Sequence, residues 1–201
     1  MIAVIAAAAF FGCIAFIALQ TSRAVCAGVA PAEDGPPPGK APAIVLVVAS
    51  ALLGAVLMSQ KTPPLQLGIA VIVVFALVAC WCSDAICGIV PDLFSLVPLA
   101  AILLFALTQR DWGTFLSAGL TFVPFALAAL FSRGYGMGWG DVKLAALTGA
   151  AVGGPLAIVA LAAACAAAAI VNRIGGLRGP IAFAPYIAAA TGVALPFGIV
   201  H

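Results

Sequence analysis

The chain has 201 residues, of which 66% are hydrophobic and only 7% carry a charge. Soluble domains carry charges on about 25% of their residues, so this composition excludes a hydrated globular surface and predicts an integral membrane protein. The formal net charge is +2, and the eight Lys and Arg residues are scattered along the chain. This pattern excludes a nucleic-acid surface, which needs a clustered basic face.

Proline, glycine and charged residues divide the chain into eight apolar segments. A helix that spans a bilayer needs about 20 apolar residues, fewer where flanking groups help. The sequence therefore predicts an all-α, polytopic membrane helix bundle of about eight transmembrane helices, folded as a single domain over residues 1–201. The expected spans are 2–19, 43–59, 65–83, 92–109, 113–131, 138–151, 155–171 and 182–200.

The first span has the length of a signal peptide but lacks a basic region before it. Its first basic residue, Arg23, follows the apolar segment, so we expect a retained helix whose N-terminus lies outside. Residues 20–42, which include PAEDGPPPGK, are expected to form a short polar loop in the cytoplasm.

Eight spans that start outside place six basic residues inside and two outside, which agrees with the positive-inside rule. The inside residues are Arg23, Lys40, Arg133, Lys143, Arg173 and Arg178, and the outside residues are Lys61 and Arg110. In this topology both termini lie outside. The third span ends and the sixth begins at the cytoplasmic face, which brings Asp84 and Asp141 to the same side of the membrane.

Asp84 and Asp141 are the candidate catalytic residues. An idle carboxylate at membrane depth costs about 3 kcal/mol, so such residues are functional by default. Two neighbouring carboxylates share a proton, which lets one act as general base on water while the other acts as acid toward a carbonyl. This is aspartyl-protease chemistry, and it needs neither a metal nor another cofactor. Gly138 and Gly140 would leave room beside Asp141 for a substrate backbone.

An alternative function is a small proton- or cation-coupled transporter, because intramembrane acids also carry protons and cations. Transporters of this kind often contain internal repeats of helices. No such repeat is visible in this chain.

Two charged residues near the candidate dyad have open interpretations. Lys143 follows Asp141 by two residues and does not share its helix face, so it either extends to the lipid headgroups or orients the substrate and tunes the dyad. Asp92 follows Pro91 at an expected helix start, where an acid interacts favourably with the helix dipole. We expect a capping role for Asp92, which is also the rival of Asp84 as a catalytic carboxylate.

The six cysteines contain no CxxC pair, and most lie within apolar segments. Free cysteine packs as a small hydrophobe, and structural zinc sites need four ligands, typically with CxxC spacing. The sequence therefore predicts neither a metal site nor a disulfide framework.

Three segments resemble the type IV prepilin peptidases. GMGWGDVKLAALTG (136–149) resembles the GxGD motif of that family. SDAICGIVPDLFSL (83–96) is similar to its second element, an Asp followed seven residues later by Pro and then Asp or Asn. IAFAPYIAAA (181–190) resembles its FGP-type segment, with Ala184 where Gly is usual. The resemblance covers about residues 43–201.

The resemblance implies a membrane aspartyl endopeptidase of the bacterial inner membrane. Such an enzyme removes the leader peptide of type IV prepilin or pseudopilin substrates at the cytoplasmic face, in pilus assembly or protein secretion. Its partners are the leader peptide and the lipid bilayer, not nucleic acid. Asp84 and Asp141 are then the catalytic dyad, and the residues in supporting motif positions are Gly138, Gly140, Pro91, Asp92 and Lys143.

The chain departs from the larger members of this family in one respect. Those members carry a cytoplasmic domain with two CxxC pairs and methylate the new N-terminus with S-adenosylmethionine. Here residues 20–42 stand in that place and hold no CxxC pair. The chain thus resembles the compact members associated with Flp/Tad-type pili, and its sequence argues against N-methyltransferase activity.

Overall fold

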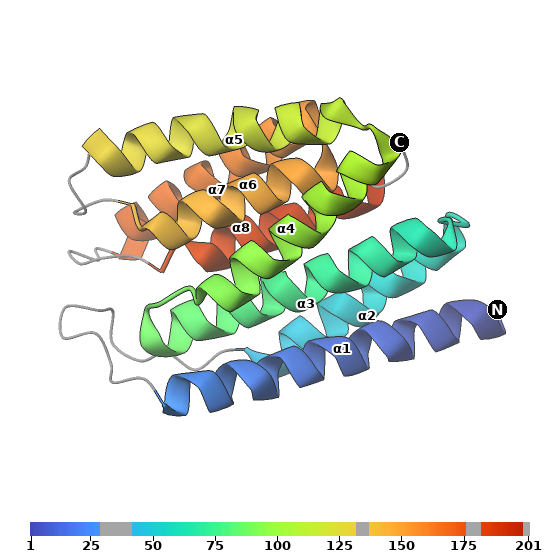
Figure 1. The fold of residues 1–201 in the computed structure, drawn as a ribbon. Helices are drawn as coiled ribbons and strands as arrows, with labels where there is room; N and C mark the ends of the chain where they lie inside the picture. The colour runs from blue at the N-terminus through green and yellow to red at the C-terminus, as the bar shows by residue number, and fades with distance from the viewer. Residues whose placement is uncertain (29–41, 132–136, 176–181, 199–201) are drawn as a thin grey trace.

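The computed structural model of the chain describes residues 1–28, 42–131, 137–175 and 182–198 (Figure 1). All the regular secondary structure in this part of the chain is α-helical, as predicted. Its helices are α1 (Ile2–Ala27), α2 (Ala43–Ser59), α3 (Pro64–Cys87), α4 (Asp92–Gln109), α5 (Trp112–Phe131), α6 (Trp139–Val152), α7 (Gly154–Gly175) and α8 (Ala184–Gly198). Most of the predicted loop 20–42 lies outside the described residues, as do Lys40, Arg133 and Arg178.

The helices have the length and composition of a polytopic membrane bundle. Helices α1, α3, α4, α5 and α7 are each long and apolar enough to cross a membrane. Helices α2 and α8 are apolar but have only 17 and 15 residues, and α6 has 14. At 1.5 Å per residue, α6 extends over about 21 Å of a hydrocarbon core that is about 30 Å thick. The three short helices therefore rely on their neighbours within the bundle.

Helix α1 continues to Ala27, eight residues beyond its predicted end at residue 19. The prediction of a loop beginning at residue 20 is therefore wrong for residues 20–27. These residues remain helical because the last turns of α1 pack on α3. Ser22 is fully buried and Cys26 nearly so, although the sequence there is polar enough to suggest a break.

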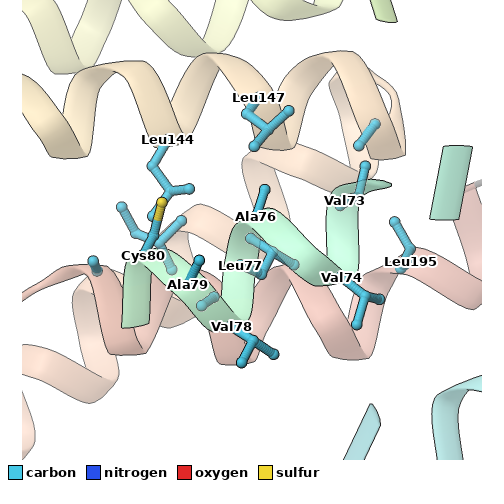
Figure 2. Packing of buried hydrophobic residues seen from close by; sticks show 14 of the residues in the cluster. Val73, Val74, Ala76, Leu77, Val78, Ala79, Cys80, Leu144, Leu147 and Leu195 are labelled. Carbon is cyan, nitrogen blue, oxygen red and sulfur yellow. The ribbon is translucent and has the colours of Figure 1, made fainter. Parts of the chain in front are cut away.

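Helices α3 and α6 lie in the interior of the bundle. Half of the apolar span of α3 is buried, against 22–33% for the other four full-length helices. Every residue of α6 from Leu144 to Val152 is buried. Leu144 and Leu147 point from α6 toward α3, where Leu144 meets Cys80 (Figure 2). A charged residue on either helix is therefore close to the protein interior.

One hydrogen bond joins the buried helix α6 to α8, and a second joins two of its neighbours, α5 and α7. The hydroxyls of Thr148 on α6 and Thr191 on α8 lie 2.8 Å apart. The Ser117 hydroxyl of α5 accepts the Gly154 N–H at the start of α7 at 2.9 Å. At Gly149, an added Cβ would come within 2.4 Å of the Ser117 carbonyl oxygen, so α5 and α6 pack in close backbone contact.

One end of the bundle gathers the helix ends that carry the candidate residues (Figure 1). The end of α3 and the starts of α4, α6 and α8 lie there. Helix α3 ends at Gly88, whose left-handed conformation (φ 67°) lets its N–H bond to the Asp84 carbonyl at 3.0 Å. The start of α1 lies at the opposite end (Figure 1).

At that opposite end, Asp111 caps the start of α5. Its carboxylate accepts the Gly113 N–H at 3.0 Å, the Thr114 N–H at 3.4 Å and the Thr114 hydroxyl. The Thr114 hydroxyl is the main cause that holds the pKa of Asp111 below its ordinary value, and the two N–H groups add to it.

We expect Asp111→Ala to lower the free energy of unfolding by about 1 kcal/mol, the usual contribution of an N-cap. The folded pKa is depressed, so the stabilisation is present above about pH 4 and is lost as the pH falls through the folded value. Thermal unfolding in detergent at about pH 7 and about pH 2 measures this. A difference between variant and parent of the same size at both pH values would contradict the assignment.

Candidate active site

Asp84 lies in the last turn of α3 with 8% of its surface exposed. Its Oδ2 atom accepts a hydrogen bond of 3.1 Å from the N–H of Ala184, the first residue of α8. The first N–H groups of a helix have no partner within the helix, and the helix dipole favours an anion there. The start of α8 therefore holds one oxygen of this buried carboxylate in a fixed position.

Asp141 is the third residue of the interior helix α6 and is half-buried. Its Oδ2 atom accepts the N–H of Gly138, the residue before the helix, at 3.3 Å. The Asp141 N–H in turn bonds to the Gly138 carbonyl at 3.1 Å. The carboxylate thus satisfies a backbone donor at the helix start, which gives it a local structural role in addition to its charge.

The structure brings Asp84 and Asp141 together, although they are 57 residues apart in the sequence. Their charges are close enough to interact, and both lie within electrostatic range of Cys80, one turn before Asp84. Within the described residues, no group of three His, Cys, Asp or Glu side chains could hold a metal ion. Two interacting carboxylates can divide the roles of acid and base between them.

Because Gly140 has no side chain, another side chain of the protein, that of Val90, packs closely against it. A Cβ added at Gly140 would lie 2.7 Å from Cβ of Val90, in the connection between α3 and α4. In this structure Val90 therefore occupies the space directly beside Gly140. At Gly138, φ is −79° and an added Cβ would make only an ordinary contact, 3.6 Å from the Asp141 carboxylate.

Lys143 and Asp92 form an ion pair between α6 and α4. Pro91 immediately precedes α4, and Asp92 is the acid in its first turn, the position predicted for it at a helix start. Its carboxylate also bonds Lys143, so the Lys143 ammonium group is paired within the protein and does not depend on the lipid headgroups. The Asp92 side chain is also 65% exposed, unlike the buried Asp84.

The structure joins Cys26 at the end of α1 to Cys87 at the end of α3 in a disulfide, with Cα atoms 6.1 Å apart. The prediction that the cysteines form no disulfide is therefore wrong for this pair. The two residues meet because α1 continues to Ala27 and packs on α3. Cys80 and Cys82, by contrast, pack in the hydrophobic core as predicted.

The sequence alone does not assign a role to two residues of the site, Ala184 and Val90. Ala184 acts through its backbone N–H, which every residue except proline has, so the residue type does not indicate this role. The only signal was its place in the FAP segment that resembles the family's FGP element. Val90 is an apolar residue in a turn, and nothing in the sequence shows that it covers Gly140.

The fold and the site together define a polytopic helical membrane protein with two interacting carboxylates on its interior helices. Residues 70–172 match the type IV leader peptidase family. Because the match covers just over half of the chain, the protein belongs to this family. The matched segment contains Asp84, Asp92, Asp141 and Lys143. No curated protein and no solved structure gives a match to the chain.

We expect Ala184→Pro to reduce peptidase activity about 10- to 100-fold. The substitution removes a hydrogen bond to the buried Asp84 carboxylate, and such a bond to a charged group contributes about 1.5–3 kcal/mol. Proline is tolerated at the first position of a helix, so α8 should still form. Ala184→Gly retains the N–H and is the matched control. Equal activity in the two variants would show that this hydrogen bond is unimportant.

Proposed function

We propose that the protein is an aspartyl endopeptidase with Asp84 and Asp141 as its catalytic dyad. The observation that carries this proposal is the convergence of the two carboxylates from α3 and α6, in a chain of the type IV leader peptidase family. Asp84 is buried and held by the start of α8, whereas its rival Asp92 is exposed and paired with Lys143.

In the proposed reaction, one carboxylate removes a proton from a water molecule, and the water oxygen attacks the scissile carbonyl. The other carboxyl group is protonated and donates its proton to the carbonyl oxygen. The tetrahedral intermediate then collapses, and the leaving amine takes up a proton from the pair. The dyad titrates as a unit, so neither residue alone owns the shared proton.

The proposed substrates are type IV prepilins or pseudopilins, cleaved between the charged leader and the apolar segment that follows. The positive-inside rule supports placing the dyad at the cytoplasmic face of a bacterial inner membrane, with both termini outside. The leader would reach the dyad from the cytoplasm. With no CxxC-containing domain in the chain, we expect the new N-terminus to stay unmethylated.

Co-expression with a candidate prepilin tests the proposal, with leader removal followed as a mobility shift on a gel. We expect the mature, shorter form only when the peptidase is present. Mass spectrometry of the mature N-terminus locates the cleavage and reports any added methyl group. Accumulation of uncleaved prepilin together with well-expressed peptidase would contradict the substrate assignment.

A further inference from the structure

Two contacts join the connection between α3 and α4 to the start of α6. The first is apolar, where Val90 lies over Gly140 so closely that no Cβ fits between them. The second is the ion pair between Asp92 and Lys143. Both contacts link residues 90–92 to residues 140–143, which are about 50 positions apart in the chain.

Each of the two joined segments adjoins one candidate catalytic carboxylate. Asp84 lies just before the α3–α4 connection, and Gly88 bonds directly to its carbonyl. Asp141 lies between Gly140 and Lys143, the two residues that make the contacts. A shift of one segment against the other would therefore move Asp141 relative to Asp84.

Direct packing between α3 and α6 adds little to what fixes the position of Asp141 relative to Asp84. Helix α6 packs mainly on α5, α8 and α4, and much less on α3. The Asp141 carboxylate itself bonds only to Gly138 at the start of its own helix, among the hydrogen bonds of the described residues. The distance between the carboxylates thus depends on how α6 is attached to its other neighbours. These are α8, whose start holds Asp84 and whose Thr191 bonds Thr148, and α4 together with the α3–α4 connection.

We infer that Asp92 and Lys143 are a positioning pair that holds Asp141 in register with Asp84. This inference rests on the proposed function. Neither residue touches the reacting atoms, and each acts through the attachment of α6 to α4. The Lys143 side chain is 24% exposed and that of Asp92 is 65% exposed, so the pair contributes little to overall stability. Its effect is on geometry, where a displacement of about 1 Å lowers a rate by about 100-fold.

The test is a double-mutant cycle with Asp92→Asn, Lys143→Met and the double variant, assayed on a purified prepilin that the parent enzyme cleaves. We expect each single variant to lower kcat about 10-fold with KM unchanged, because substrate binding is intact while the dyad is misaligned. The double variant should lose no more than either single variant, since both remove the same interaction. Lys143→Arg, which keeps the ion pair, should retain most of kcat.

Lys61→Met is the matched control, because it removes a lysine in the connection between α2 and α3, at the opposite end of the bundle (Figure 1). Thermal unfolding of each variant shows whether the fold is intact. A raised KM with unchanged kcat would overturn the inference in favour of direct substrate binding by Lys143. Losses that multiply in the double variant would also overturn it.

Activity measurements on the Asp84, Asp141 and Lys143 variants distinguish an error in the positioning pair from an error in the catalytic dyad. Normal kcat in Lys143→Met, alongside inactive Asp84→Asn and Asp141→Asn variants, would contradict the positioning pair alone. Cleavage that survives in Asp84→Asn or Asp141→Asn would contradict the dyad itself.

Discussion

Asp84→Asn and Asp141→Asn should each abolish leader removal, with a loss of at least about 1,000-fold. Asparagine has nearly the shape of aspartate but can neither accept a proton as a base nor donate one as a carboxylic acid. General acid–base catalysis contributes about 100- to 10,000-fold per group, and here both groups act on one bond. Initial rates of prepilin cleavage in detergent or liposomes measure the effect.

Asp92→Asn and Asp111→Asn are the informative comparisons for this prediction. Asp92→Asn should retain clear activity, reduced about 10-fold through the loss of its partner Lys143. Asp111→Asn, at the opposite end of the bundle, should leave the rate close to that of the parent. If Asp92→Asn were inactive while Asp84→Asn still cleaved, the dyad would be Asp92 and Asp141. Cleavage by Asp141→Asn would remove the basis for any dyad.

Gly140→Ala should reduce cleavage about 100-fold without unfolding the protein. The new Cβ would lie 2.7 Å from Cβ of Val90, so the start of α6 has to move away from the α3–α4 connection. Asp141 is the next residue and would move with it, and a displacement of about 1 Å costs about 100-fold in rate. The measurement is kcat together with the thermal unfolding midpoint.

A second substitution, at Val90, should partly rescue the Gly140→Ala variant. Removal of the opposing Cβ by Val90→Gly in the Gly140→Ala background should restore part of the rate, because the two segments can close again. Gly119→Ala is the control, since a Cβ there meets no atom within 4 Å and alanine suits a helix interior better than glycine. A Gly140→Ala enzyme with parental kcat would show that the Val90 contact does not set the position of Asp141.

The helices were predictable because their boundaries are local. Pro63 precedes α3 and Pro64 is its first residue, Gly88 ends it in a left-handed conformation, and Pro91 precedes α4. Each of these residues imposes a backbone conformation without help from the rest of the fold. The exception is the end of α1, where packing on α3 keeps residues 20–27 helical in spite of their polar sequence.

Asp84 and Asp141 were also identifiable from the sequence, because a carboxylate within an apolar segment is costly anywhere in the chain. Their supporting contacts were not identifiable in this way. The bond from Ala184 to Asp84 spans 100 residues, the Asp92–Lys143 pair 51 and the Cys26–Cys87 disulfide 61. Such contacts depend on which helix faces pack together, and residue types alone do not show which faces these are.

The sequence by itself determined that this protein is a helical membrane bundle and that two of its few acids are unusual. Both results follow from the cost of placing polar groups in lipid, which acts on each segment separately. Only the tertiary structure decided what surrounds those acids: the start of α8 at Asp84, Val90 at Gly140, and Lys143 with Asp92 rather than with lipid. These arrangements arise from the packing of helices far apart in the chain, where shape and close contact select the partner.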